Sequence, residues 1–262
     1  MGTVAIDRFQ IDNLKVEVYP DARSAGEAAA MEASAVLQEL AGDNAGDIGV
    51  IFATGASQMK VLEALTSLPG LPWDRVIGFH MDEYEAMPPD HPASFRRYMR
   101  ERLSSRVAMK VFHEIDATGD LDTLCIDYAD MLDKANPQLC LLGIGENGHL
   151  AFNDPPVADF HDPLTMKVVE LDDACKQQQF AEGWFARIED VPRRAVTLTI
   201  PTLLRVPRLI ASVPGPRKAH IVYRSLTEPI TTACPATGLR THPDCTVYLD
   251  RDSASELFKM GR

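Results

Sequence analysis

The chain has 262 residues, of which 45% are hydrophobic and 24% charged, a balance that excludes wholesale disorder and provides for a substantial globular core. Its 26 Lys and Arg residues against 38 Asp and Glu residues give a net charge of −12. Such an acidic protein has no general attraction to nucleic acids or anionic membranes, so we expect neither as a partner, and a local pocket must hold any phosphate it binds.

The first part of the chain alternates short apolar segments with segments of helical period. Residues 15–19 alternate polar and apolar side chains, which predicts an edge strand, and the apolar runs 48–53 and 76–81 predict buried strands. Between these segments, apolar residues recur at helical spacing over 24–42 and again over 61–65.

The rest of the chain continues this alternation. A helix is predicted to begin at Pro92, another covers 121–132, and a third begins near Pro216. Further strands are predicted at 139–144, 195–200, 209–213 and 246–249. The polar, proline-bounded stretch 154–192 is the candidate for a mobile lid, although its 166–171 piece has strand character.

Alternating strands and helices predict an α/β fold, with an open, mostly parallel, doubly wound, Rossmann-like sheet and helices flanking it. The sequence contains no internal repeat or linker, so we expect residues 1–262 to form a single domain. The five cysteines are scattered without a CxxC pair, and no signal peptide or apolar run of ~20 residues is present, which together predict a soluble cytoplasmic protein. The histidines are dispersed without ligand spacing, so no metal site is predicted.

The first candidate site loop is Thr54, Gly55, Ala56 and Ser57, between a predicted strand and a helix. Open α/β sheets bind ligands where their strands end, and small residues there let backbone N–H groups approach an anion. The two hydroxyls add further donors. The alternative is a plain turn in which Ser57 caps the helix.

The second candidate is the adjacent carboxylate pair of Asp82 and Glu83, directly after the strand at 76–81. A carboxylate at the end of a strand near a cleft is a candidate general base. The alternative is a solvated turn, or a short helix capped by Asp82.

The third candidate is the GxGxxG match over 143–148. A dinucleotide site requires a helix to begin at this loop, but Pro155 and Pro156 leave room for little more than one turn, so we reject that interpretation. The loop instead presents Asn147, His149 and Asp154 together.

The fourth candidate is the loop 214–218, in which Arg217 and Lys218 begin a predicted helix. Cations in the first turn of a helix interact unfavourably with the helix dipole. A bound anion between the two side chains would offset this cost, so the pair indicates an anion site. The alternative is a pair of solvated surface cations.

These loops together resemble the glucosamine-6-phosphate deaminase (isomerase) family, which is related to the 6-phosphogluconolactonases. The resemblance rests on the segments ATGAS, DEY followed by DHPAS, GHLAFNDP, VPGPRKA and RTHPDCTVYLD, in the family's order from about residue 45 to 250. Lactonases usually read DER in place of DEY, which sets this chain on the deaminase side. The resemblance implies conversion of glucosamine 6-phosphate and water into fructose 6-phosphate and ammonia, with a small-molecule sugar phosphate as ligand and neither a metal nor an organic cofactor.

The resemblance also implies roles for individual residues. Asp82 matches the base that moves a proton between C2 and C1 of the open-chain sugar, and His149 matches the residue that opens the ring. Asp154 takes the place of a family Glu that supports the histidine. The phosphate loop is matched by Thr54, Gly55, Ala56 and Ser57, together with Lys218.

The chain departs from the family pattern at three points. Asn147 stands where the deaminases carry an Asp that orients the histidine, and Asp154 is one methylene shorter than the Glu it replaces. An arginine that usually joins the lysine on the phosphate has no match in 171–180, where Lys176 is the nearest cation.

Two other functions remain open at this point. A sugar-phosphate lactonase would use His149 to activate water, and a non-catalytic sensor would bind a sugar phosphate without turnover. Assembly into a homo-oligomer is also left open.

Overall fold

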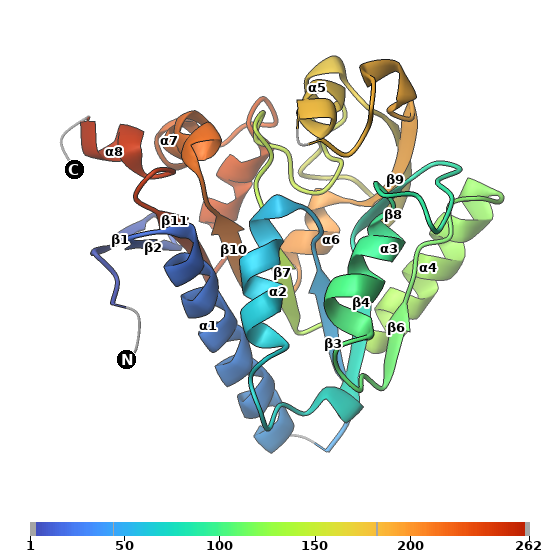
Figure 1. Cartoon of the computed structure of the whole chain (residues 1–262), viewed down its shortest axis with the longest axis horizontal. Coiled ribbons are helices and arrows are strands. Elements are labelled where there is room, and N and C mark those ends of the chain that lie inside the picture. The colour runs from blue at the N-terminus through green and yellow to red at the C-terminus, as the bar shows by residue number, and fades with distance from the viewer. Residues whose placement is uncertain (1–3, 44, 182, 260–262) are drawn as a thin grey trace.

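The computed structural model describes residues 4–43, 45–181 and 183–259 and is built on one eight-stranded sheet (Figure 1). Its strands run in the order β1 (Asp7–Ile11), β2 (Leu14–Tyr19), β11 (Cys245–Asp250), β10 (Arg208–Val213), β7 (Leu139–Leu142), β3 (Ile48–Phe52), β4 (Val76–His80) and β6 (Val111–His113). All neighbours are parallel except β1 and β2, which pair antiparallel at one edge. The expected α/β class and mostly parallel sheet are therefore confirmed.

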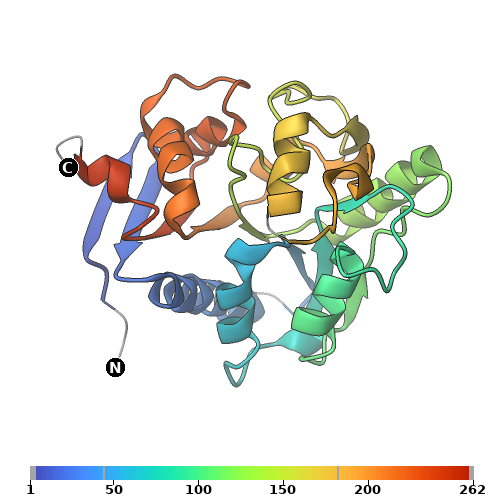
Figure 2. The same ribbon diagram turned by 45° about the horizontal axis from the view of Figure 1, so that its top comes forward.

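Helices cover both faces of the sheet (Figures 1 and 2). They are α1 (Ala22–Asp43), α2 (Met59–Leu65), α3 (Phe95–Met99), α4 (Leu121–Ala135), α5 (Asp173–Ala181), α6 (Ile200–Leu204), α7 (Ala219–Thr227) and α8 (Ser255–Lys259). Successive side chains of a strand point to opposite faces, so Val50 and Phe52 belong to the buried cluster that includes α1 and α2, whereas Ile51 belongs to the cluster that includes α4 and α7. Burial on both faces explains why β3 reads as a continuous apolar run.

A smaller antiparallel sheet stands beyond the ends of the main strands. It has the order β5 (Asp82–Tyr84), β9 (Arg194–Leu198) and β8 (Met166–Glu170). Only Met81 separates β5 from β4, and its carbonyl accepts a hydrogen bond of 2.8 Å from Leu198 N. The segment 154–192 thus contains β8, as its strand character predicted, followed by α5.

The centre of the main sheet contains a topological switch point. From β3 the chain adds β4 and β6 on one side, and it then returns to add β7, β10 and β11 on the other. In the register of the sheet, Phe52 lies opposite both His80 and Leu141. The loops after β3, β4 and β7 therefore leave the sheet at the same level, at the position where open α/β sheets bind ligands.

Three local expectations are wrong. The strand predicted at 15–19 as an edge lies between β1 and β11, because β1 covers it. The helix expected to begin at residue 24 begins at Ala22, where Asp21 Oδ1 accepts a hydrogen bond from Ser24 N. The helix expected to begin at Pro92 begins at Phe95, because the Ser94 side chain caps it.

Among the helices of the described residues, none combines the length and the apolar character that a membrane span requires.

Candidate active site

A cavity of about 290 Å³ opens at the carboxyl ends of the central strands. Its walls come from the loops after β3, β4, β7 and β10 and from the region of α5. Of the residues that the sequence analysis singled out, the lining includes Thr54, Gly55, Ala56, Ser57, Asp82, His149 and Lys218. Asn147 and Asp154 are not part of this lining. The fold therefore brings all four predicted loops to one cavity.

Two of these loops share one design. Gly55 and Gly215 have φ angles of 93° and 97°, which favour glycine, and each precedes a single 3₁₀ turn (56–58 or 216–218) that leads into a helix. The amide of Gly215 donates to the Asp250 carboxylate at 3.1 Å, so this N–H group is already engaged within the loop. The cationic side chains, rather than the Gly215 amide, are what this loop offers to an anion.

Asp82 stands at the cavity side of β5. Its side chain is 6% exposed, and Oδ1 has no hydrogen-bond partner among the described groups. Burial raises the pKa of Asp82 well above its ordinary value, and the negative charges of Glu83 and Asp154 raise it further. A carboxyl group whose pKa is shifted toward neutrality can both take up and return a proton, as acid–base catalysis requires.

Glu83, the second carboxylate of the pair, has a different position. Because successive residues of a strand point to opposite sides, it turns toward the start of α3, where it is fully buried. Its carboxylate accepts hydrogen bonds from Ser94 Oγ, Phe95 N and Arg96 N at 3.0–3.2 Å. Glu83 therefore anchors a helix, and only Asp82 is available to a ligand.

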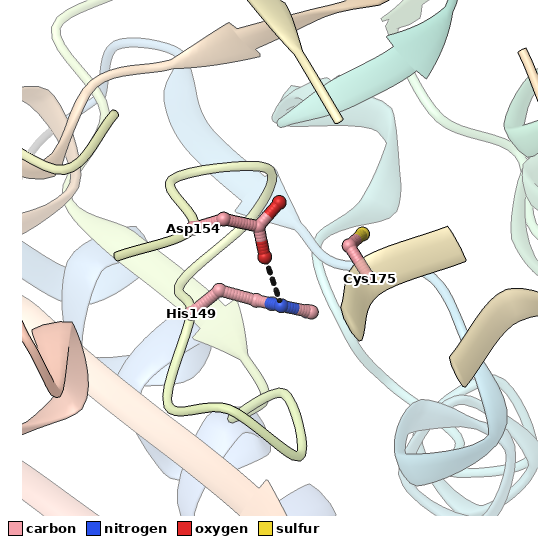
Figure 3. A group of neighbouring side chains, drawn as sticks. All are labelled: His149, Asp154 and Cys175. Atoms are coloured by element: carbon pink, nitrogen blue, oxygen red, sulfur yellow. Dashed lines mark ion pairs between the residues drawn. The ribbon is translucent and has the colours of Figure 1, made fainter. Parts of the chain in front are cut away.

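His149 reaches the cavity from the loop after β7 and is supported from behind. Its Nδ1 atom lies 2.8 Å from Asp154 Oδ1 (Figure 3). Asn147 joins the two residues, since its Nδ2 donates to Asp154 Oδ1 at 2.9 Å and its Oδ1 accepts from His149 N at 3.0 Å. Burial alone would raise the pKa of Asp154, but the His149 ring, the Asn147 amide and the Cys175 thiol together lower it. Asp154 is thus held as an anion beside the imidazole.

The glycines of the loop after β7 have a steric role. A Cβ atom added at Gly145 would lie 2.2 Å from the His149 ring, so only glycine allows the imidazole to fold back over this turn. No helix begins in the described loop, and the next regular element is β8. The second glycine of the GxGxxG match therefore leaves room for the His149 ring.

The structure identifies the second cation on the cavity wall as Arg217. It lines the cavity beside Lys218 and lies 3.3 Å from a carboxylate oxygen of Glu146. Lys176, the nearest cation that the sequence offered in 171–180, lies 3.7 Å from Asp173 instead and does not belong to the lining. The sequence analysis noted Arg217 as part of its loop but did not select it as a site residue.

The region of α5 contributes residues that the sequence analysis missed. Gln178, Gln179 and Trp184 line the cavity. Gln178 Oε1 accepts from Glu146 N at 2.9 Å, and Gln179 Oε1 accepts from the Tyr84 hydroxyl at 2.7 Å. No local motif marks these residues, because they reach the site through long-range packing of α5 against β5 and the loop after β7.

One group of side chains has the composition of a metal site. Potential ligand atoms of His149, Asp154 and Cys175 all lie within 4.8 Å of one another. The dispersed positions of these residues in the sequence gave no ligand spacing, and it is the packing of α5 that brings Cys175 to the other two.

Known proteins of one family match most of this chain. Residues 20–248 match the family described as glucosamine-6-phosphate isomerases/6-phosphogluconolactonase. A glucosamine-6-phosphate deaminase of Exiguobacterium sp. is 33% identical over 238 residues, 89% of each chain, and one of Rhodopirellula baltica is 33% identical over 95% of this chain and 98% of its own.

Solved structures give the same relationship. A monomeric glucosamine-6-phosphate deaminase superposes with a TM-score of 0.83 at 27% identity, covering 92% of this chain and 98% of its own. A 6-phosphogluconolactonase of Trypanosoma brucei superposes with a TM-score of 0.76 at 17% identity, covering 96% of this chain and 100% of its own, and so shares the fold.

Proposed function

Because the chain belongs to the family of glucosamine-6-phosphate isomerases and 6-phosphogluconolactonases, enzymes of carbohydrate metabolism, we propose that it is an amino-sugar phosphate deaminase. In the proposed reaction, glucosamine 6-phosphate and water give fructose 6-phosphate and ammonia. The observation that carries the proposal is the joint placement of Asp82 and His149 on one cavity whose rim also bears Lys218. Support for a deaminase comes also from the relatives that carry this name over most of the chain.

The phosphate of the substrate is proposed to bind between the two glycine loops. Thr54 and Ser57 offer hydroxyl donors, and Lys218 offers a positive charge on the opposite loop. A dianion held away from the reacting carbons supplies binding energy that positions the sugar. This local charge also offsets the repulsion that a protein of net charge −12 exerts on an anionic substrate.

Proton transfer between carbons is assigned to Asp82. In its ionised form the carboxylate removes the proton from C2 of the open-chain amino sugar, and the resulting carboxylic acid returns a proton to C1. Both carbons are adjacent, so one group can serve both without moving far. As O1 gains a proton and the amine nitrogen loses one, C2 becomes an imine carbon. Water then adds to C2, and the C–N bond breaks to leave the ketone and ammonia.

Ring opening is assigned to His149. An imidazole can pass a proton to or from the ring oxygen, and Asp154, 2.8 Å from Nδ1, orients the ring for this transfer. Asn147 is a positioning residue, because it holds both Asp154 and the backbone of His149.

The proposal is tested by incubating the purified chain with glucosamine 6-phosphate and identifying both products. Ammonia and fructose 6-phosphate are expected to appear in equal amounts. Glucosamine without its phosphate is the matched control and should react very poorly, since it lacks the group that Lys218 holds. Binding of the amino-sugar phosphate without any product would favour the sensor function instead.

A lactonase is the second candidate, because the His149–Asp154 pair at 2.8 Å could equally activate water for attack on a lactone. In that reaction Asp82 would have no proton to move. Asp82 lines the cavity with its Oδ1 atom unpartnered among the described groups, a placement that aldose–ketose transfer uses and lactone hydrolysis does not require. This difference favours the deaminase.

Replacing Asn147 with Asp is expected to change turnover of glucosamine 6-phosphate by less than about tenfold, or 1.4 kcal/mol. Asp154 already supplies the charge beside His149, and Asn147 provides only hydrogen bonds. Steady-state kinetics of the wild type, Asn147→Asp and Asp154→Ala on one substrate test this, with the larger loss expected for Asp154→Ala. A wild type that is inert until Asn147 becomes Asp would contradict the assignment.

Replacing Gln179 with Leu is expected to raise KM by up to about tenfold, the effect of one neutral hydrogen bond. Gln179 lines the cavity and its Oε1 already accepts from the Tyr84 hydroxyl, so its amide NH2 is the group we expect to donate to the substrate. Gln177→Leu is the matched control, since Gln177 lies on the same helix but is exposed. Equal KM values for the two variants would exclude Gln179 from substrate binding.

A further inference from the structure

The cluster of His149, Asp154 and Cys175 combines three different kinds of metal ligand. Figure 3 shows the three side chains converging from two segments, the loop after β7 and helix α5. Their ligand atoms lie within 4.8 Å of one another, and all three residues are buried, with Asp154 and Cys175 fully enclosed. Imidazole, carboxylate and thiolate are the ligands that zinc takes in proteins.

The distances suit a small ion after a modest adjustment. Zinc bonds of about 2.0–2.3 Å in a tetrahedron place pairs of ligand atoms roughly 3.3–3.6 Å apart. His149 Nδ1 and Asp154 Oδ1, now 2.8 Å apart, would separate slightly, while Cys175 Sγ would move toward them. His149 also lines the cavity, so the cluster lies directly behind the cavity wall, on the side of the ring that faces Asp154.

We propose that His149, Asp154 and Cys175 bind one thiophilic divalent cation of the Zn²⁺ type, and that its binding competes with the sugar phosphate. The competition rests on the role proposed above for His149, because an imidazole bound to a metal can no longer shuttle a proton. Metal binding itself does not depend on that role.

The chemistry of the cluster sets which ions can bind. Asp154 is already held as an anion, and the overall charge of −12 attracts cations. Cys175 must lose its proton to the solvent when the metal–sulfur bond forms, at a cost in free energy. Only ions that bind thiolate strongly offset that cost, so we expect Zn²⁺, Cd²⁺ and Co²⁺ to bind but not Mg²⁺ or Ca²⁺.

The direct test is the absorption spectrum of the whole chain titrated with Co²⁺, with Zn²⁺ then added to displace it. One equivalent is expected to bind, with a thiolate-to-cobalt charge-transfer band that Zn²⁺ abolishes. Because this readout uses the wild type and no turnover, it is independent of the deaminase assignment. A wild type that shows no thiolate band would overturn the proposal.

Variants separate this cluster from other thiols and from surface histidines. Cys175→Ser is expected to lose the band and to weaken Zn²⁺ binding by roughly 10- to 100-fold or more, as for loss of groups that support a metal. Cys125→Ser, which removes a thiol on α4, and His220→Gln, which removes an exposed imidazole, should both keep wild-type affinity. Inhibition of the wild type by Zn²⁺ should be relieved by raising the concentration of glucosamine 6-phosphate. Wild-type affinity in Cys175→Ser, or loss of the band in either control, would overturn the assignment.

Discussion

Replacing Asp82 with Asn is expected to lower turnover of glucosamine 6-phosphate by roughly 10²–10⁴-fold while changing substrate binding little. The amide keeps the shape of the side chain but cannot accept the proton from C2. Steady-state kinetics give the turnover, and calorimetric titration with fructose 6-phosphate gives the affinity. Near-normal turnover of Asp82→Asn would show that another group is the base.

Glu83→Gln is the matched control for this substitution. The two carboxylates are adjacent in sequence, but Glu83 accepts hydrogen bonds at the start of α3 and does not line the cavity. Its replacement should lower the thermal unfolding temperature, since buried hydrogen bonds to a charged group stabilise by about 1.5–3 kcal/mol each. Turnover by the fraction that remains folded should be retained above the apparent pKa of Asp82, which falls when the negative charge of Glu83 is removed.

The pH dependence of the reaction follows from the raised pKa of Asp82. The base must be ionised, so turnover should fall as the pH drops through an apparent pKa above the ordinary range of an aspartate. A group whose pKa is raised by folding stabilises the protein fully below its unfolded-state pKa, and this stabilisation is lost as the pH rises through the folded-state value. Asp82→Asn should therefore unfold at a higher temperature than the wild type on the alkaline side, and an equal temperature at every pH would contradict the shift.

Replacing Lys218 with Ala is expected to weaken binding of fructose 6-phosphate by about 1.5–3 kcal/mol, or roughly 10- to 150-fold. Lys218 lines the cavity from the loop after β10, and its loss leaves a phosphate dianion in an acidic protein with one positive charge fewer to hold it. Calorimetric titration measures the change.

Lys176→Ala is the matched control for the phosphate prediction. Lys176 lies on α5 beside Asp173 and is not part of the cavity lining, so its replacement should leave the affinity for fructose 6-phosphate unchanged. Equal affinities of Lys218→Ala and the wild type would exclude Lys218 from the phosphate site.

Much of the fold could be predicted because its central strands are buried on both faces. Continuous apolar runs such as 48–53 and 139–144 are typical of strands that are buried on both faces, and they stand between segments of helical period. The edge strand β1 was missed because its alternation, DRFQI, is too short and polar to stand out, and β5 was missed because three residues carry no period.

Some residues of the candidate site could be predicted from local sequence motifs, and others are brought there only by long-range packing. Loops that follow strands carry their chemistry in consecutive residues, so Thr54, Asp82 and His149 could be selected from sequence. Cys175 and Gln179 lie on a helix without a recognisable motif, and only the packing of α5 brings them to the site. Side chains alternate between the two sides of β5, so Asp82 faces the cavity and Glu83 does not. The sequence did not reveal this difference, because it gave no sign of a three-residue strand.

The measurement that most directly distinguishes a deaminase from a lactonase is the ratio of kcat/KM for their two substrates, determined on one preparation of the protein. Ammonia release reports on glucosamine 6-phosphate, and acid release reports on 6-phosphogluconolactone. With Asp82 and His149 on one cavity, we expect efficient ammonia release and little or no enzymatic hydrolysis of the lactone. Rapid lactone hydrolysis without ammonia release would contradict the account.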